Sequence, residues 1–297
     1  MNLRDRLIDP RSPDRRPRRA AYALPTMFTA GNVFLGFYSI IEVFQGVIDF
    51  LANSATATGH FKTAALAIGW AVFLDGLDGR IARMTNTVSD FGREMDSLAD
   101  VITFGIAPAV LAFAWGIQFV DPPTDLITLE QLRRAGYFFS FLFLLCGAAR
   151  LARFNIQKNP IPKNPGRPDR KYFVGLAIPA AAGMVAAVVY ACGGVPLRSW
   201  VFSAGWLVLL GMLGLLMVST WRYPSFKDLN LLQPRSSISV VVAGSIFCLI
   251  WSFTAPTLLA MSAGYVLTGI VTRVGGVVRR RLKRTPPPPA PHVEAPV

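Results

Sequence analysis

The sequence predicts an all-α fold, a polytopic membrane bundle of about eight transmembrane helices with its functional site at the cytoplasmic side. Of the 297 residues, 53% are hydrophobic and only 16% are charged. The apolar residues are grouped in blocks of about 20, the length that a helix needs to cross the hydrocarbon core. A soluble chain of this size would instead show short amphipathic segments between polar turns.

Eight apolar blocks are predicted to span the membrane. In chain order they are residues 25–49, 61–84, 97–120, 135–156, 172–193, 199–220, 237–254 and 256–273. Pro108 and Pro179 interrupt two of these blocks, where we expect kinks. The blocks form one membrane domain, residues 23–274, between a basic N-terminal segment, residues 1–22, and a basic, Pro-rich disordered tail, residues 275–297.

The charges of the connecting loops predict the orientation of the chain. The stretch 158–171, which follows the fourth span, holds five cations, and the loop after the sixth span is also basic. The loop after the third span, residues 121–134, carries three acids before its two arginines. Because cytoplasmic loops are enriched in Lys and Arg, this alternation predicts an integral membrane protein with both termini in the cytoplasm.

The net charge of +13 comes largely from the two ends of the chain. Residues 1–20 hold seven arginines, and residues 273–284 hold six cations. Basic segments beside apolar spans are explained by membrane orientation and by anionic lipid headgroups. Because no folded nucleic-acid-binding module has room here, we predict the bilayer and no nucleic acid as a partner.

Four aspartates mark the connection between the second and third spans. If residues 61–84 and 96–120 form a helical hairpin, Asp75 and Asp78 lie about 60° apart on one helix. Asp96 and Asp100 lie about 40° apart on the other, so each pair shares one face. The hairpin therefore predicts four carboxylates in one small volume.

Four converging carboxylates require counter-charge, which divalent cations supply. Oxygen ligands favour Mg²⁺ or Mn²⁺, and the absence of His from residues 75–100 argues against zinc. Four carboxylates can hold two ions about 3.5–4 Å apart, an arrangement used in phosphoryl displacement.

Small and basic residues accompany the aspartates. Gly79 and Gly92 would let a bulky ligand approach the backbone, and Ala82 keeps the same face shallow. Arg83 can donate two hydrogen bonds to a phosphate.

The alternative interpretation of this segment is a solvated acidic loop. The spacing on one face and the interspersed glycines disfavour that interpretation for the four aspartates, but we adopt it for Asp90, Arg93 and Glu94. His60 and His292 have no partner in the sequence pattern, and we assign them no role.

Residues 75–100 contain the pattern D-x2-D-G-x2-A-R-x8-G-x3-D-x3-D at all of its specified positions. In this respect the chain resembles the CDP-alcohol phosphatidyltransferase family. The resemblance implies an active site with two divalent ions and the pyrophosphate of a CDP-linked lipid. The implied ligands of the ions are Asp75, Asp78, Asp96 and Asp100. Asp100 would also be the catalytic base, while Gly79, Ala82, Arg83 and Gly92 would shape the nucleotide site.

Further stretches resemble one branch of that family, the integral-membrane CDP-diacylglycerol–serine O-phosphatidyltransferases. They are residues 24–37, 96–109, 150–155, 175–183 and 222–227. Thr26 departs from the asparagine that is common in the branch. The implied substrates are CDP-diacylglycerol and L-serine, the implied products are phosphatidylserine and CMP, and the implied assembly is a homodimer.

The acceptor pocket is predicted from residue chemistry. The carboxylate of serine needs a cationic partner, and Arg150 and Arg153 lie at the cytoplasmic end of the fourth span. The alternative is that both are ordinary flanking cations, but Asn155 follows them and they lie at the same depth as the aspartates, which favours the acceptor role. Thr29 and Asn32 share one face of the first span, where they either bind the CDP moiety or join helices.

Two alternatives to serine transfer remain open from the sequence. Glycerol-3-phosphate or inositol phosphate could be the acceptor, because an arginine pair also suits a phosphate. A cation transporter would also use intramembrane aspartates, but it would be expected to show repeats and midplane sites.

Overall fold

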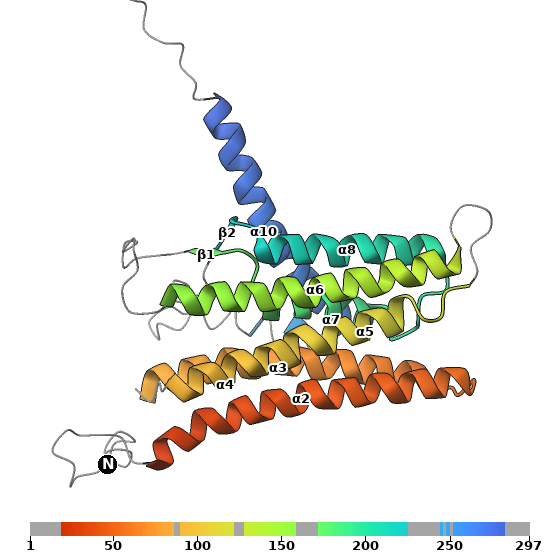
Figure 1. Cartoon of the computed structure of the whole chain (residues 1–297), viewed down its shortest axis with the longest axis horizontal. Coiled ribbons are helices and arrows are strands. Elements are labelled where there is room, and N and C mark those ends of the chain that lie inside the picture. Colours follow the sequence, from red (N-terminus) through yellow and green to blue (C-terminus); the bar gives the residue numbers. More distant parts are fainter. Residues whose placement is uncertain are drawn as a thin grey trace, which may run out of the picture.

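The structure is a computed structural model, and it describes residues 19–85, 90–121, 128–158, 172–224, 244–245, 248–249 and 252–282. The elements among these residues are α2 (Arg19–Leu51), α3 (Ala57–Thr85), α4 (Asp90–Asp100), the π-helix η1 (Val101–Ile106), α5 (Ala107–Gly116), α6 (Leu129–Lys158), β1 (Tyr172–Val174), α7 (Ile178–Ala191), α8 (Trp200–Val218), β2 (Arg222–Pro224) and α10 (Thr254–Leu282). Helices α2 to α6 and α8 have roughly aligned axes, α7 packs against α3, and the end of α10 projects from the bundle (Figure 1). The prediction of a helical bundle is confirmed.

Five helices in the described part of the chain are long and apolar enough to cross a membrane. They are Met27–Leu51, Glu94–Gly116, Leu129–Ile156, Trp200–Val218 and Thr254–Arg273. The helix Ile178–Ala191 is apolar but shorter. The described residues therefore support an all-helical membrane protein, but they do not confirm the predicted count of eight spans. Most of the predicted span 237–254 lies outside them.

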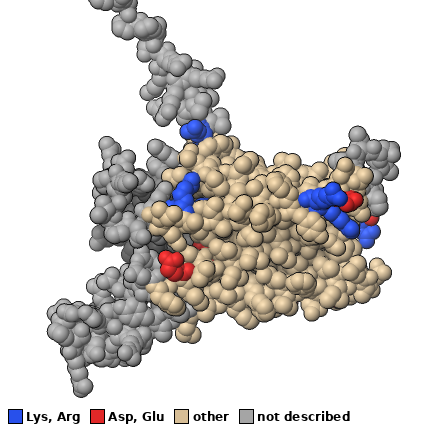
Figure 2. Space-filling view, viewed as in Figure 1, with Lys and Arg blue, Asp and Glu red and all other residues tan. Residues whose placement is uncertain are grey.

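The surface agrees with a membrane location. On the face drawn in Figure 2, charged side chains gather near the two ends of the bundle, and the broad middle carries almost none. Large apolar side chains such as Phe34, Phe44, Phe141 and Leu215 are more than half exposed on the helices. Because lipid tails are as apolar as these side chains, exposing the side chains to lipid carries no free-energy penalty.

The predicted span 172–193 is wrong over its first six residues. Residues Tyr172–Val174 form strand β1, which pairs antiparallel with β2, with Phe173 opposite Tyr223. Gly175 follows with φ +79°, a conformation that ends the strand and that side chains disfavour. Helix α7 then begins at Ile178, with Pro179 in its first turn, where its missing N–H costs no hydrogen bond.

The third predicted span is continuous in length but is not a uniform α-helix. Between α4 and α5, the backbone N–H of Ala107 donates to the carbonyl of Ile102, five residues earlier. Pro108 lies in the first turn of α5 and has no N–H to continue the α-helical pattern. The resulting wide turn, η1, begins directly after Asp100, and π-turns of this kind are frequent at functional sites.

Helix α2 packs closely against η1. The hydroxyl of Thr103 donates to the backbone carbonyl of Asn32 at 3.0 Å. A Cβ added at Gly36 would lie 2.7 Å from the Thr103 hydroxyl oxygen and 2.8 Å from its Cα. The close approach of α2 to the segment that follows Asp100 therefore depends on the missing side chain at Gly36.

Replacing Gly36 by alanine is expected to destabilise the protein by about 1–3 kcal/mol, because α2 and η1 must separate to admit the methyl group. Thermal unfolding in detergent measures this as a lower Tm. Gly69→Ala in α3 is the matched control, since no atom lies within 4 Å of a Cβ at that position. A Gly36→Ala protein as stable as the Gly69→Ala protein would contradict the packing described here.

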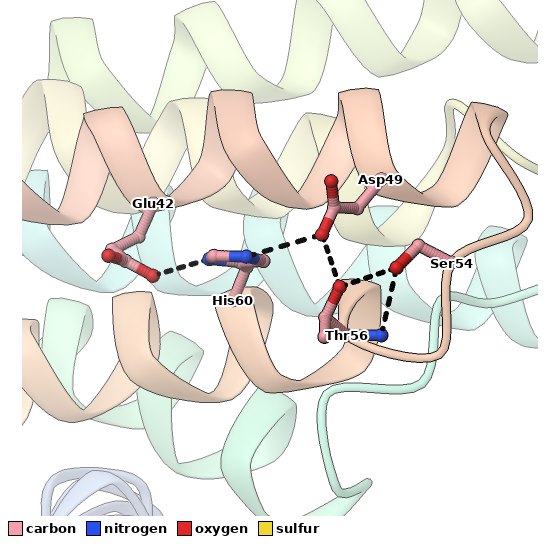
Figure 3. A network of polar contacts seen from close by, with 5 residues as sticks. All are labelled: Glu42, Asp49, Ser54, Thr56 and His60. Carbon is pink, nitrogen blue, oxygen red and sulfur yellow. Dashed lines mark hydrogen bonds and ion pairs between the residues drawn. The ribbon is translucent and has the colours of Figure 1, made fainter.

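A polar network joins α2 to α3 at the end of this helix pair that is remote from Asp75 (Figure 3). The Nδ1 of His60 lies 2.8 Å from a carboxylate oxygen of Glu42, and its Nε2 lies 3.4 Å from Asp49. The hydroxyl of Thr56 donates to Asp49 and pairs with the Ser54 hydroxyl at 2.6 Å. His60, to which the sequence assigned no role, thus bridges two carboxylates of the neighbouring helix.

Candidate active site

Three of the four predicted aspartates converge. Asp75 comes from α3, and Asp96 and Asp100 come from successive turns of α4. Each offers one carboxylate oxygen such that the three oxygens lie within 4.8 Å of one another. Asp100 is 9% exposed, and the other two are half-buried. The predicted meeting of the two helix faces is therefore observed for these three residues.

The remaining motif residues lie on the same two helices. Asp78, Gly79, Ala82 and Arg83 belong to the backbone of α3, but their side chains lie outside the described part of the structure. Gly92 lies in α4, one turn before Asp96. Their roles in binding metal and nucleotide stay predictions.

The chemistry of the donor set fits a divalent cation. Three negative carboxylates at this separation repel one another strongly unless a positive charge lies between them. All of the grouped donors are carboxylate oxygens, without His or Cys, and such hard donors favour Mg²⁺ or Mn²⁺ over zinc. The two residues on α4 are four apart, so both carboxylates can reach one ion from the same helix face.

Helix α2 supplies buried polar side chains close to η1. Thr29 is 6% exposed and Asn32 is 3% exposed. The Asn32 carbonyl accepts the Thr103 hydrogen bond, whereas its side-chain oxygen has no hydrogen-bond partner among the described residues. A buried amide oxygen without a partner is costly, so a bound polar ligand would relieve it. This observation favours the binding alternative for Asn32.

The two arginines of α6 have different surroundings. The guanidinium of Arg153 donates to the carbonyl of Val218 at 3.1 Å and to that of Val174 at 3.4 Å. Val218 is the last residue of α8, where a cation interacts favourably with the free carbonyls of the helix end. Gly175 also packs against this end of α8, because a Cβ at residue 175 would lie 2.5 Å from the Met217 carbonyl oxygen. Arg153 thus links α6 to the end of α8.

Arg150 is close enough to one of the carboxylates for their charges to interact. Its guanidinium interacts electrostatically with Asp100, and its Nε is buried without a hydrogen-bond partner among the described residues. A buried cation is stabilised by negative charge in its neighbourhood, and Asp100 carries such a charge. Arg150 therefore differs from Arg153 in that its charge interacts with that of Asp100.

One contact and one electrostatic interaction near the aspartates were not predicted. The side-chain amide of Asn155 in α6 donates to the Ser97 hydroxyl at 2.9 Å, which joins α6 to the turn of α4 between Asp96 and Asp100. Tyr265 of α10 interacts electrostatically with Arg150. Ser97 lies within residues 96–109, one of the stretches that resemble the serine O-phosphatidyltransferase branch. Nothing in the sequence associates Tyr265 with residues 75–100.

Comparison with known proteins agrees with this geometry. The model of the CDP-alcohol phosphatidyltransferase family matches residues 22–218. The chain therefore belongs to the CDP-alcohol phosphatidyltransferase family, as the motif predicts.

The curated relatives are more specific. A CDP-diacylglycerol–serine O-phosphatidyltransferase of Helicobacter pylori is 39% identical over 215 residues, covering 72% of this chain and 77% of the relative. One of Bacillus subtilis is 32% identical over 206 residues, covering 69% of this chain and 91% of the relative. An archaetidylserine synthase of Methanothermobacter thermautotrophicus is 31% identical over 151 residues, covering 50% of this chain and 55% of the relative.

Proposed function

We propose that this protein transfers the phosphatidyl group of CDP-diacylglycerol to L-serine, producing phosphatidylserine and CMP. The observation that carries the proposal is the convergence of Asp75, Asp96 and Asp100 inside the family motif. The acceptor is supported by the names of the relatives, which include serine both where the lipid is diacylglycerol and where it is archaeal.

In the proposed reaction, Asp100 takes the proton of the serine hydroxyl. The serine oxygen forms a bond to the lipid-linked phosphorus while the bond from that phosphorus to CMP breaks. Asp75, Asp78, Asp96 and Asp100 would hold two divalent ions, Mg²⁺ or Mn²⁺. When bound, such ions neutralise the pyrophosphate and the charge that develops on CMP.

The two substrates are assigned to different residues around the aspartate group. Thr29 and Asn32, with Gly79, Ala82, Arg83 and Gly92, would bind the CDP moiety, and the buried Asn32 side chain supports this placement. Arg150 would bind the serine carboxylate, because it is a buried cation whose charge interacts with that of Asp100. Arg153 would act indirectly, since its guanidinium is bonded to the backbone of α8 and β1.

The membrane arrangement is part of the proposal. The site would lie at the cytoplasmic surface with both termini in the cytoplasm, as the basic loops indicate. In this arrangement the acyl chains of the lipid remain in the bilayer while its headgroup reaches the aspartates. The homodimer implied by the family resemblance also stays a proposal, and chemical cross-linking in membranes would test it.

A comparison of acceptors tests the proposed function. Purified protein is supplied with CDP-diacylglycerol, divalent ion and labelled serine, glycerol-3-phosphate or inositol phosphate in parallel. We expect labelled lipid to form only with serine, because the names of these relatives give serine as the acceptor. Lipid product from either phosphate and none from serine would reject serine as the acceptor while leaving the family chemistry intact.

A further inference from the structure

The last turns of α6 connect the aspartate helix with other parts of the bundle. The side-chain amide of Asn155 donates to the hydroxyl of Ser97 in α4 at 2.9 Å, and both residues are half-buried. Arg153, two residues earlier, donates to the backbone carbonyls of Val218 and Val174. Because successive residues of a helix are about 100° apart, these two side chains leave α6 in nearly opposite directions. The end of α6 is thus tied to α4 on one side and to α8 and β1 on the other.

Ser97 lies in the turn of α4 that carries two of the converging aspartates. It follows Asp96 directly and precedes Asp100 by three residues, which is just less than one helical turn. A side chain that anchors Ser97 therefore restricts the rotation of α4 about its own axis. This rotation matters, because the carboxylates of α4 meet Asp75 of α3 only when their shared face is turned toward it.

A second hydrogen bond holds the same segment on the other side of Asp100. The hydroxyl of Thr103, three residues after Asp100, donates to the carbonyl of Asn32 in α2 at 3.0 Å. This contact lies in η1, where the α-helical hydrogen-bond pattern is interrupted, so it restrains the residues before Asp100 less directly. The bond from Asn155 to Ser97 acts on the α-helical side of this interruption. It therefore restrains the two aspartates of α4 directly.

Another interhelical hydrogen bond provides a comparison far from the aspartates. The hydroxyl of Ser203 in α8 donates to the carbonyl of Gly116 at the end of α5 at 2.7 Å, and Ser203 is completely buried. A helical segment from Asp100 to Gly116 is about 24 Å long. The two hydrogen bonds join helices in a similar way, but only that of Asn155 reaches the turn with the aspartates. Their comparison therefore separates a positioning role from general stability.

We propose that Asn155 is a positioning residue for the divalent-ion site. Its amide holds Ser97, and with it the orientation of the aspartates of α4 toward Asp75. Asn155 contacts neither the ions nor the reacting phosphorus in this scheme. The inference rests on the proposed function, and it adds that α6 contributes to ion affinity as well as carrying Arg150 of the proposed acceptor site. Loss of the bond should weaken ion binding and leave the chemical step intact once the ions are bound.

The test measures Mn²⁺ binding to the purified protein by electron paramagnetic resonance, without substrate or turnover. Asn155→Leu removes the amide at nearly constant size, and Ser97→Ala removes the hydroxyl that accepts its hydrogen bond. Each variant should raise the Kd for Mn²⁺ by about three- to tenfold, as expected when a hydrogen bond that supports ligand groups is lost. Ser97→Thr keeps the hydroxyl and should bind Mn²⁺ nearly as tightly as wild type.

The double variant tests the route of the effect. If Asn155 acts through Ser97, the combination of Asn155→Leu with Ser97→Ala should raise the Kd for Mn²⁺ no further than the more severe single variant does. Multiplication of the two single effects would show that the residues act independently. That result, or an unchanged Kd in both single variants, overturns the proposal.

Ser203→Ala is the control for stability. It should lower the Tm, because a buried hydrogen bond is lost, and leave the Kd for Mn²⁺ unchanged. In steady-state kinetics, Asn155→Leu should raise the ion concentration for half-maximal activity by the same factor as the Kd. The kcat at saturating ion and the serine KM should stay close to wild type.

Two further results would contradict the positioning role. An equal rise in the Kd from Ser203→Ala would reduce the effect to general stability. A higher serine KM with an unchanged Kd for Mn²⁺ would make Asn155 a contact of the acceptor instead. If the wild type binds Mn²⁺ but transfers no phosphatidyl group to serine, the proposed function fails separately, and the Mn²⁺ series still decides the role of Asn155.

Discussion

Asp100→Asn will reduce the rate of phosphatidylserine formation by about 10²–10⁴-fold, the range that a positioned base contributes. The substitution keeps the shape of the side chain but removes its capacity to accept the serine proton. Asp100 is the most buried of the three converging aspartates, so water cannot easily replace it as the base. Release of labelled CMP measures turnover, and retention of labelled CDP-diacylglycerol measures binding, which should persist.

Glu94→Gln is the control for the Asp100 experiment. Glu94 is an exposed carboxylate on the same helix, and it loses one negative charge in the same way. Its variant should retain wild-type turnover. A fully active Asp100→Asn protein would remove Asp100 as the base, and a Glu94→Gln protein that is equally inactive would assign the effect to the net charge of α4.

Removal of divalent ions is the second large effect. EDTA should lower turnover by at least about 10²-fold, because neutralisation of the transferring phosphate by a metal contributes several kcal/mol. Mg²⁺ or Mn²⁺ added in excess should restore the activity, since the ligands offered by Asp75, Asp96 and Asp100 are all oxygens. The assay follows CMP release against free ion concentration.

Two controls make the ion experiment specific. EDTA saturated with Mg²⁺ should not inhibit, which excludes an effect of the chelator on the membrane. Asp96→Asn should require a higher ion concentration for half-maximal activity than wild type, because one anionic ligand is lost. Full turnover in EDTA alone would contradict the assignment of the aspartates as metal ligands.

The sequence predicted those parts of the molecule that follow from short-range periodicity. The apolar blocks predicted α2, α6 and α8 to within several residues, and the spacing of the aspartates predicted that Asp75 would meet Asp96 and Asp100. Both inferences use only the helical repeat and one tight hairpin. Neither requires knowledge of how distant segments pack.

The missed features depend on contacts between distant residues. No pattern within one helix predicts that Arg153 donates to the carbonyls of Val218 and Val174, which lie 65 and 21 residues away in the sequence. His60 bridges two carboxylates across the hairpin of α2 and α3, which a periodicity argument within one helix cannot show. Strand β1 likewise exists only because β2 returns beside it.

The π-helix η1 has a consequence for how the protein tolerates changes in length. In a continuous α-helix, one inserted or deleted residue rotates everything beyond it by about 100°. A π-helical turn contains one residue more than an α-helical turn. The deletion of one residue from Val101–Ile106 would therefore convert such a turn to ordinary α-helix. Such a deletion would leave the angular position of Asp96 and Asp100 relative to Ala107–Gly116 nearly unchanged, whereas a deletion elsewhere in the span would rotate the two segments relative to each other.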